Sequence, residues 1–348
     1  MKSTTIPRST MTARRVSDTT ARLNVSYAEC ARLPLALAES GSHPMAIVSF
    51  GPAPSGPFPC PVIALALPQI DGPPMAEVWT SDRPVHMQED SGCAVAMNGN
   101  FLIGSISLDE QADMPLDTTA YEAYGTMLRQ LRAAGYPYLW RIWNYFPRIN
   151  DDQNGLERYR RFCVGRYRAF AETLAEFPSS LPAATAVGTK SGPLQLVFLA
   201  GTQPATHLGN PRQLNAYDYP QRYGPRSPSF ARATLTRSGR ECLLYLSGTA
   251  SVVGHASRHT GIPREQTAET IRNIQAVLHH AAHAEGFDLI QAQRQALYKV
   301  YVRDSGSLSD IREAIIDSPL SREHFLFLQG DLCRKELLVE IEGLVISD

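Results

Sequence analysis

The chain is poor in lysine, in net charge and in long apolar runs. Four of its 33 basic residues are lysines (Lys2, Lys190, Lys299 and Lys335), which leaves 29 arginines, and 34 acidic residues bring the formal net charge to −1. This balance supplies no concentrated basic charge, so neither nucleic acid nor an anionic membrane surface is expected as a partner. No apolar stretch approaches the roughly 20 residues that a membrane-spanning helix needs. Genomic base composition explains an excess of arginine, and a site for carboxylates or phosphates is the alternative explanation.

Cysteine and histidine are present, but not in metal-binding patterns. The six cysteines lie far apart and none forms a CxxC pair, which argues against a structural zinc site and a dense disulfide scaffold. His255, His259 and the histidines within 279–283 lack an HExxH motif or a cysteine partner, so no metal is expected. Residues 1–24 are rich in Ser, Thr and Arg and lack the apolar segment of a secretory signal. We therefore predict a disordered leader over residues 1–24 and a reduced, cytoplasmic protein.

The hydrophobic pattern predicts two domains with a repeated plan. The first half contains strand-like runs at 22–27, 45–50, 62–67, 76–80 and 95–106, a helix from about 118 to 135, a strand at 138–145 and a helix at 156–175. The second half contains strands at 194–199, 230–236 and 242–246, a helix at 264–284, a strand at 296–302, a helix at 308–316, and strands at 325–328 and 337–341.

The repeat favours the α+β class, with two similar domains that each form a mainly antiparallel sheet with helices packed on one face. A segment rich in proline and glycine at 178–192 separates the halves. We therefore expect an N-terminal domain over 25–185 and a C-terminal domain over 193–348.

The densest group of arginines lies between Arg141 and Arg168. On the helix that begins near Leu156, the 3.6-residue period places Arg166 near the middle of the apolar face and Arg158 on its flank. A guanidinium that points into an apolar face must be paired or must meet a ligand, because burying it alone is prohibitive. An internal ion pair with a glutamate and a contact with an anionic ligand are therefore both open for Arg166.

A second candidate region is the long segment 212–228, in which arginines alternate with tyrosines, among them Tyr219, Tyr223 and Arg226. Loops of this length tend to carry binding sites, and both residue types donate directed hydrogen bonds. Interleaved arginine and aromatic residues also occur in RNA-binding proteins. The near-zero net charge and the lack of an RNA-binding motif argue against that interpretation.

The C-terminal strand predicted over 337–341 continues into a segment with two glutamates on one face. Alternation along a strand places Glu340 and Glu342 on the face opposite Val339 and Ile341. Either both carboxylates lie on a solvated face, or Glu340 lies in a cleft where burial raises its pKa and makes it a general acid. The residues alone leave both interpretations open.

Several of these segments resemble the chorismatase family. The resemblance rests on 139–145 (LWRIWNY), 155–166 (GLERYRRFCVGR), 223–230 (YGPRSPSF), 247–255 (SGTASVVGH) and Glu340, and it covers most of the chain from about residue 25. The C-terminal half is also similar to the small imine-deaminase (RidA/YjgF) fold, through 273–278, 299–304 and 339–342. The resemblance implies two RidA/YjgF-like domains that bind chorismate in the cleft between them, without a metal or an organic cofactor.

Carried onto this sequence, the resemblance also implies residue roles. Glu340 would protonate the enol methylene of chorismate, and the oxocarbenium-like centre that forms would labilise the ether. Arginine would bind the two carboxylates of the substrate, because its planar fork matches a carboxylate. The substrate-binding residues implied in this way are Arg158, Arg166, Tyr219, Tyr223, Arg226 and Gly248.

The expected identity of the product rests on two residues, Cys333 and Gly248. Hydrolytic members of the family carry alanine where this chain has Cys333, and a cysteine there together with Gly248 is similar to the type that forms 3-hydroxybenzoate and pyruvate. The thiol would assist an intramolecular route, in which the ring hydroxyl displaces the enolpyruvyl group before aromatisation. The alternatives within the family are a mixture of 3- and 4-hydroxybenzoate, or hydrolysis to a dihydroxycyclohexadiene carboxylate. Outside it they are an imine or enamine deaminase, and a non-catalytic binding module for an aromatic carboxylate.

Overall fold

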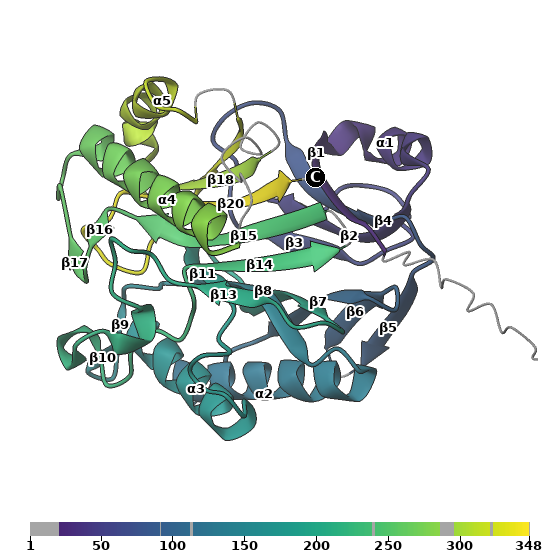
Figure 1. The fold of residues 1–348 in the computed structure, drawn as a ribbon, viewed down its shortest axis with the longest axis horizontal. Helices are drawn as coiled ribbons and strands as arrows, with labels where there is room; N and C mark the ends of the chain where they lie inside the picture. The colour runs from purple at the N-terminus through teal and green to yellow at the C-terminus, as the bar shows by residue number, and fades with distance from the viewer. Residues whose placement is uncertain are drawn as a thin grey trace, which may run out of the picture.

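Three large sheets, two short hairpins and five α-helices occur in the computed structural model, which describes residues 21–90, 92–111, 114–238, 241–285, 296–320 and 323–347. The helices within these ranges are α1 (Leu33–Ser40), α2 (Leu116–Ala134), α3 (Arg158–Thr173), α4 (Pro263–Glu285) and α5 (Leu308–Ile316). Figure 1 shows α2 and α3 together on one side of the molecule and α4 with α5 on the other.

In each sheet the strands neighbour one another in an order that differs from their order along the chain. In spatial order, the first sheet consists of β1 (Leu23–Glu29), β4 (Met75–Ser81), β2 (His43–Phe50) and β3 (Val62–Leu65). The second sheet consists of β11 (Ala183–Thr189), β8 (Tyr138–Pro147), β12 (Leu194–Gly201), β7 (Phe101–Leu108), β6 (Cys93–Met97) and β5 (His86–Asp90). The third sheet consists of β13 (Thr206–Leu208), β14 (Ala233–Ser238), β15 (Glu241–Ala250), β20 (Val339–Ser347), β18 (Leu297–Val302) and β19 (His324–Gln329). Two short hairpins complete the fold, β9 (Asp152–Gln153) with β10 (Leu156–Glu157) and β16 (Val252–Val253) with β17 (Ala256–Ser257).

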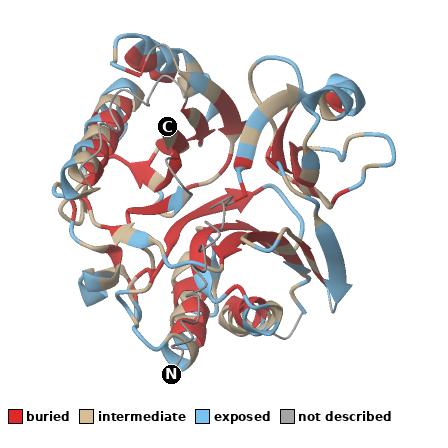
Figure 2. Ribbon diagram, turned by 45° about the vertical axis from the view of Figure 1, so that its right-hand side comes forward, coloured by how far each residue is buried: buried red, intermediate tan, exposed pale blue. Residues whose placement is uncertain are grey.

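The second and third sheets have the architecture that the sequence predicts, because each is mainly antiparallel and carries two helices on one face. Within the second sheet β8 and β11 run parallel, and within the third β18 and β19 do so, while the other neighbouring strands are antiparallel. Apolar residues of α2 and α3 form one core with the second sheet, and those of α4 and α5 form another with the third. A central core joins the remaining faces of all three sheets. Figure 2 shows this as buried strands in the middle of the molecule and helices buried on their inner sides.

The alternation of side chains along β20 decides where its glutamates lie. Val339, Ile341 and Val345 belong to the core beneath α4 and α5. Successive side chains of a strand point to opposite faces, so Glu340 and Glu342 point away from those helices and toward the second sheet. Both glutamates are buried, at 4% and 1% exposure. The interpretation that placed both carboxylates on a solvated face is therefore wrong.

The division between the halves differs from the predicted one. The segment 178–192, expected to be a joint, contains β11, and the strand at 194–199, expected in the second domain, is β12 of the second sheet. The two large sheets therefore separate after Gly201 rather than near residue 190. Strand β11 consists of small residues and lies at the junction of the halves, where Ala183 N–H donates to Thr234 Oγ1 (2.8 Å) and Ala184 N–H to Ser247 Oγ (2.9 Å). Its lack of large apolar side chains removes the pattern by which strands are recognised.

The predicted leader over residues 1–24 lies outside the described residues except for its last four, and Leu23 and Asn24 already belong to β1. Within the described residues, no helix has the length and apolar character required to cross a membrane.

Candidate active site

A cleft of about 600 Å³ opens where the two halves of the molecule meet. One wall comes from the β9–β10 hairpin and the start of α3, and the other from the segment 213–232, the end of β15 and the segment 333–340. A small cavity of about 30 Å³ shares five lining residues with the cleft, and we call this region the closed end because Glu340 within it is buried. The shared residues are Tyr159, Phe230, Gly248, Cys333 and Glu340.

Glu340 lies at this closed end, directly against Gly248 of the neighbouring strand. A Cβ atom built on Gly248 would lie 2.0 Å from Glu340 Oε1, which is far inside van der Waals contact. Only glycine therefore leaves room for the carboxyl group in this position. The structure brings together Glu340, Cys333 and Gly248, three of the residues that the sequence pointed to.

The surroundings of Glu340 favour its protonated form. Burial raises the pKa of its carboxyl to about 8, and the nearby carboxylate of Glu342 adds to the rise. Arg141, Arg232 and Arg303 act in the opposite direction but do not outweigh burial. A carboxylic acid that keeps its proton at neutral pH can act as a general acid.

Cys333 also lines the closed end. Burial raises the pKa of its thiol to about 12, and the neighbouring Glu340 adds to the rise. The thiol is therefore protonated at neutral pH and is a weak hydrogen-bond donor rather than a thiolate nucleophile.

Arg166 of α3 reaches the small cavity without an ion pair. Its side chain is buried, and its Nε and Nη2 atoms have no hydrogen-bond partner among the described residues. The guanidinium carbon lies 5.0 Å from the ring centroid of Phe162 and 6.0 Å from that of Phe230. Of the two alternatives left open by the sequence, the ion pair with a glutamate does not occur within the described part of the chain. Unpaired donors beside a cavity indicate a place for an anionic group of a ligand.

The structure does not bring Arg158 and Arg226 into the cleft. Arg158 is buried, but its two terminal nitrogens bind the carboxylate of Glu110 and its Nε donates to Pro147 O (3.2 Å). Arg226 is exposed and lies over the ring of Tyr167, 4.4 Å from its centroid. Neither residue lines the cleft or the small cavity, because each guanidinium already has a partner elsewhere.

Tyr219 and Tyr223 do line the cleft, and they pack against an arginine that was not among the predicted site residues. The guanidinium of Arg334 lies 4.3 Å from the ring centroid of Tyr223 and 5.4 Å from that of Tyr219. Arg334 follows Cys333 directly, and this adjacency was the only signal in the sequence that could have drawn attention to it. The arginines that line the cleft are Arg160, Arg222, Arg232 and Arg334.

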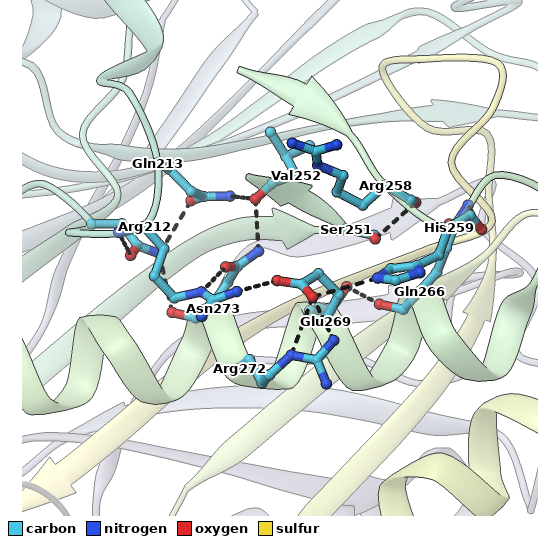
Figure 3. A network of polar contacts seen from close by, with 12 residues as sticks. Arg212, Gln213, Ser251, Val252, Arg258, His259, Gln266, Glu269, Arg272 and Asn273 are labelled. Carbon is cyan, nitrogen blue, oxygen red and sulfur yellow. Dashed lines mark hydrogen bonds and ion pairs between the residues drawn. The ribbon is translucent and has the colours of Figure 1, made fainter. Parts of the chain in front are cut away.

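Polar side chains of α4 bind the backbone of segments that line the cleft. Figure 3 shows Gln266, Glu269 and Asn273 of α4 in this network of polar contacts. Asn273 Nδ2 donates to Ala250 O (3.1 Å) at the end of β15 and to Val252 O (2.9 Å) at the start of β16. Gln266 Nε2 donates to Glu336 O (2.8 Å), and its Oε1 accepts from Leu338 N–H (2.8 Å). These buried amides replace the ladder bonds that irregular segments lack, and they fix the backbone that leads to Glu340.

No cluster of three or more His, Cys, Asp or Glu side chains suited to a metal ion occurs among the described residues. The side chains that line the closed end offer an acid (Glu340), a thiol (Cys333) and a guanidinium group (Arg166). A protonated carboxyl group and unpaired positive charge at the end of a water-accessible cleft define a site for acid catalysis on a small anion.

Comparison with known proteins agrees with this class. The family model described as Chorismatase FkbO/Hyg5-like, N-terminal, matches residues 77–200. A 3-hydroxybenzoate synthase of Streptomyces hygroscopicus is 37% identical over 284 residues, which cover 78% of this chain and 82% of the relative. A chorismatase of Streptomyces rapamycinicus is 35% identical over 297 residues, which cover 82% of this chain and 86% of the relative. A crystal structure of a chorismatase superposes with a TM-score of 0.84 at 31% identity, covering 94% of this chain and 99% of that one. The chain belongs to the chorismatase family.

Proposed function

We propose that this protein converts chorismate to 3-hydroxybenzoate and pyruvate. The observation that carries the proposal is the burial of Glu340 at the closed end of an arginine-lined cleft, where burial raises its pKa to about 8, beside Arg166, whose Nε and Nη2 atoms have no hydrogen-bond partner among the described residues. Chorismate is a small dicarboxylate with an acid-labile enol ether, so a buried acid and guanidinium forks are the groups that its cleavage requires. The 37% identity to a 3-hydroxybenzoate synthase supports this product.

The proposed chemistry begins with a proton transfer. Glu340 gives its proton to the methylene carbon of the enolpyruvyl group, and positive charge develops at the carbon that bears the ether oxygen. Arg166 binds a substrate carboxylate at the closed end, while Arg160, Arg222 and Arg334 are placed to bind the other nearer the mouth. General acid catalysis contributes ~10²–10⁴-fold, and positioning by the arginines supplies much of the rest.

In the second step the oxygen of the neighbouring ring hydroxyl bonds to the ring carbon that carries the ether, while the bond from that carbon to the enolpyruvyl oxygen breaks and releases pyruvate. The bond from the hydroxyl oxygen to its original ring carbon then breaks. Loss of a proton from the carbon that now carries the oxygen gives 3-hydroxybenzoate and replaces the proton that Glu340 gave. The atoms of chorismate equal those of 3-hydroxybenzoate plus pyruvate, so this route consumes no water, whereas the hydrolytic route adds one. We propose that Cys333, as a protonated thiol at the closed end, favours the intramolecular route over hydrolysis. Tyr219 and Tyr223 shape the pocket from the same wall, beside Arg334.

The test is to incubate the purified chain with chorismate and to identify the products by chromatography. We expect equimolar pyruvate and 3-hydroxybenzoate. A dihydroxycyclohexadiene carboxylate, or 4-hydroxybenzoate in quantity, would contradict the proposed product but retain chorismate cleavage. Stabilisation by chorismate without pyruvate release would indicate a binding module, and ammonia release from an amino-acid-derived imine would indicate a deaminase.

A further inference from the structure

Strand β15 has an irregularity beside Glu340. Its pairing with β20 runs from Cys242 to Leu246, which lies opposite Gly343, and then resumes at Thr249 opposite Ile341. The two residues between, Ser247 and Gly248, form a bulge that is outside the ladder. Bulges leave backbone groups unpaired unless another partner binds them, and this one contacts the carboxyl group of Glu340 through Gly248.

Thr185 of β11, from the other half of the molecule, binds that bulge. Its Oγ1 accepts from Gly248 N–H (2.9 Å) and from Arg141 Nη2 (2.5 Å), and it donates to Glu342 Oε2. A hydroxyl group has one donor and two acceptor positions, so all three are used and its orientation is determined. The Cγ2 atom of Thr185 lies 3.2 Å from the place that a Cβ on Gly248 would take, so the side chain also supports the bulge sterically.

Glu342 is held in turn by three further groups. Arg141 Nη2 lies 2.6 Å from its Oε2, while Lys299 Nζ (2.9 Å) and Trp143 Nε1 (2.8 Å) bind its Oε1. Burial would raise the pKa of the Glu342 carboxyl, but Lys299 and Arg141 outweigh it and hold the pKa below its usual value. Glu342 is therefore a carboxylate that accepts the hydrogen bond from Thr185.

We propose that Thr185 and Glu342 are positioning residues for the general acid, because they hold the Gly248 bulge, and with it the place of the Glu340 carboxyl, from across the junction between the two halves. This inference rests on the proposed role of Glu340. Neither residue is assigned contact with substrate: Thr185 acts through Gly248, and Glu342 acts through Thr185 and through its charge. Residues from both halves of the molecule thus determine the position of the Glu340 carboxyl.

The charges around Glu340 give Glu342 a second effect. The charged and titratable groups that act on the Glu340 carboxyl or share its cavity come from several elements. They are Arg141 on β8, Tyr159 and Arg166 on α3, Arg232 before β14, Arg303 after β18, Cys333 before β20, and Glu342 on β20. Among the charged groups in this set, only Glu342 is negative. Its removal therefore shifts the pKa of Glu340 downward, and the proton that the reaction needs is lost at lower pH.

The first test compares Thr185→Val with Thr185→Ser in the full chain. Valine keeps the shape and removes the hydroxyl, whereas serine keeps the hydroxyl. We expect T185V to lower kcat for pyruvate release by about tenfold or more with KM changed by about twofold at most, since misplacement of a catalytic group costs rate rather than binding. We expect T185S to stay within about threefold of the parent kcat. A folded T185V with the parent's kcat would overturn the proposal, and so would a T185S that loses as much as T185V.

The second test is Glu342→Gln, which tests the proposed positioning role even if T185V does not fold. The basic limb of the pH profile of kcat should move to lower pH, because the pKa of Glu340 falls. An unmoved limb would contradict the proposal. The parent and Glu340→Gln are assayed alongside. A parent without pyruvate release would refute the proposed function, and an active E340Q would refute the role of Glu340. If the parent releases pyruvate and E340Q does not, a folded T185V with the parent's kcat would refute only the positioning role.

Discussion

Glu340 and Glu342 are two residues apart on one strand and yet differ in protonation. Burial raises the pKa of Glu340 to about 8, with Glu342 adding to the rise, while Lys299 and Arg141 overcome burial at Glu342 and keep its pKa low. Two carboxyl groups whose environments separate their pKa values are a common arrangement at sites of acid–base catalysis. The strand alternation puts both on one face, and the surrounding charges then give them different tasks.

This separation predicts a pH dependence. Glu340 must carry its proton to act as an acid, so kcat/KM for chorismate should be constant below pH 7 and should fall as pH rises through about 8. The direction follows from the raised pKa, because the reactive form is lost above it. Steady-state pyruvate release measured on both sides of pH 8 checks this. A rate that rises through pH 8 would mean that the deprotonated form is the active one.

The second prediction at this scale concerns Cys333 and the identity of the product. Cys333→Ala removes the thiol from the closed end, so product should be diverted from 3-hydroxybenzoate toward the hydrolysed diene, while total pyruvate release continues. Chromatography of the two ring products gives the ratio. The matched control is Cys60→Ala, since Cys60 is a buried cysteine in a separate core and should leave the ratio unchanged. An unchanged ratio in C333A would remove the thiol from the choice of product.

At the scale of elements, the close approach of α2 and α3 depends on Gly165. A Cβ at this position would lie 2.0 Å from the backbone oxygen of Asp117, so Gly165→Ala should force the helices apart and destabilise the protein by about 1–3 kcal/mol. Gly125 is also inside a helix, but a Cβ there meets only the end of the Arg129 side chain at 3.2 Å. Gly125→Ala should therefore stabilise by about 0.5–1 kcal/mol. Chemical denaturation of both variants measures this difference, and equal effects would refute the packing argument.

The elements with strong periodicity could be predicted from the sequence, and those without it could not. The helix predicted at 308–316 has the bounds of α5, and the one at 264–284 differs from α4 by one residue at each end. Strand β11 was missed because its small residues show no alternation of apolar and polar groups. The strand predicted at 194–199 is β12, but its pairing with β7 and β8 does not follow from the sequence, because these partners lie far away along the chain.

The same distinction applies to the candidate site. The burial of Arg166 followed from its place on an apolar helix face, whereas the partner of Arg158, Glu110, lies 48 residues away and could not be identified from spacing. Position on a helix therefore predicts that a guanidinium is buried, but not what it binds. For Arg226, no local pattern distinguished the ring of Tyr167 from a substrate carboxylate.

At the scale of the whole molecule, a buried charge cluster joins the three sheets behind the site. Lys299 of the third sheet binds Glu77 of the first sheet (2.9 Å) and Glu342 (2.9 Å), and Arg141 of the second sheet binds Glu342 as well. All four side chains are buried. The arrangement neutralises two carboxylates with two cations at the point where the sheets meet, close to the closed end of the cleft.

Removing one partner from this cluster should be costly. Lys299→Met leaves Glu77 without its cation, so we expect a loss of about 3–5 kcal/mol in the free energy of unfolding. The control is Arg168→Ala, which breaks an exposed pair with Glu172 on α3 and should change the free energy of unfolding far less, because exposed ion pairs contribute little. Denaturant unfolding monitored by tryptophan fluorescence compares the two. Similar small effects in both would show that the cluster contributes nothing to holding the sheets together.

The most direct test of general acid catalysis at this site is the initial rate of pyruvate release from chorismate at neutral pH by Glu340→Gln. Glutamine keeps the size of the side chain but cannot supply the proton, so the rate should fall about 100-fold or more. Glu336→Gln is the matched control, because Glu336 lines the same cleft but accepts a hydrogen bond from Ser257 (2.7 Å) and takes no part in the proposed chemistry. It should keep most of the parent rate. A folded E340Q that retains more than about a tenth of the parent rate would contradict general acid catalysis by Glu340.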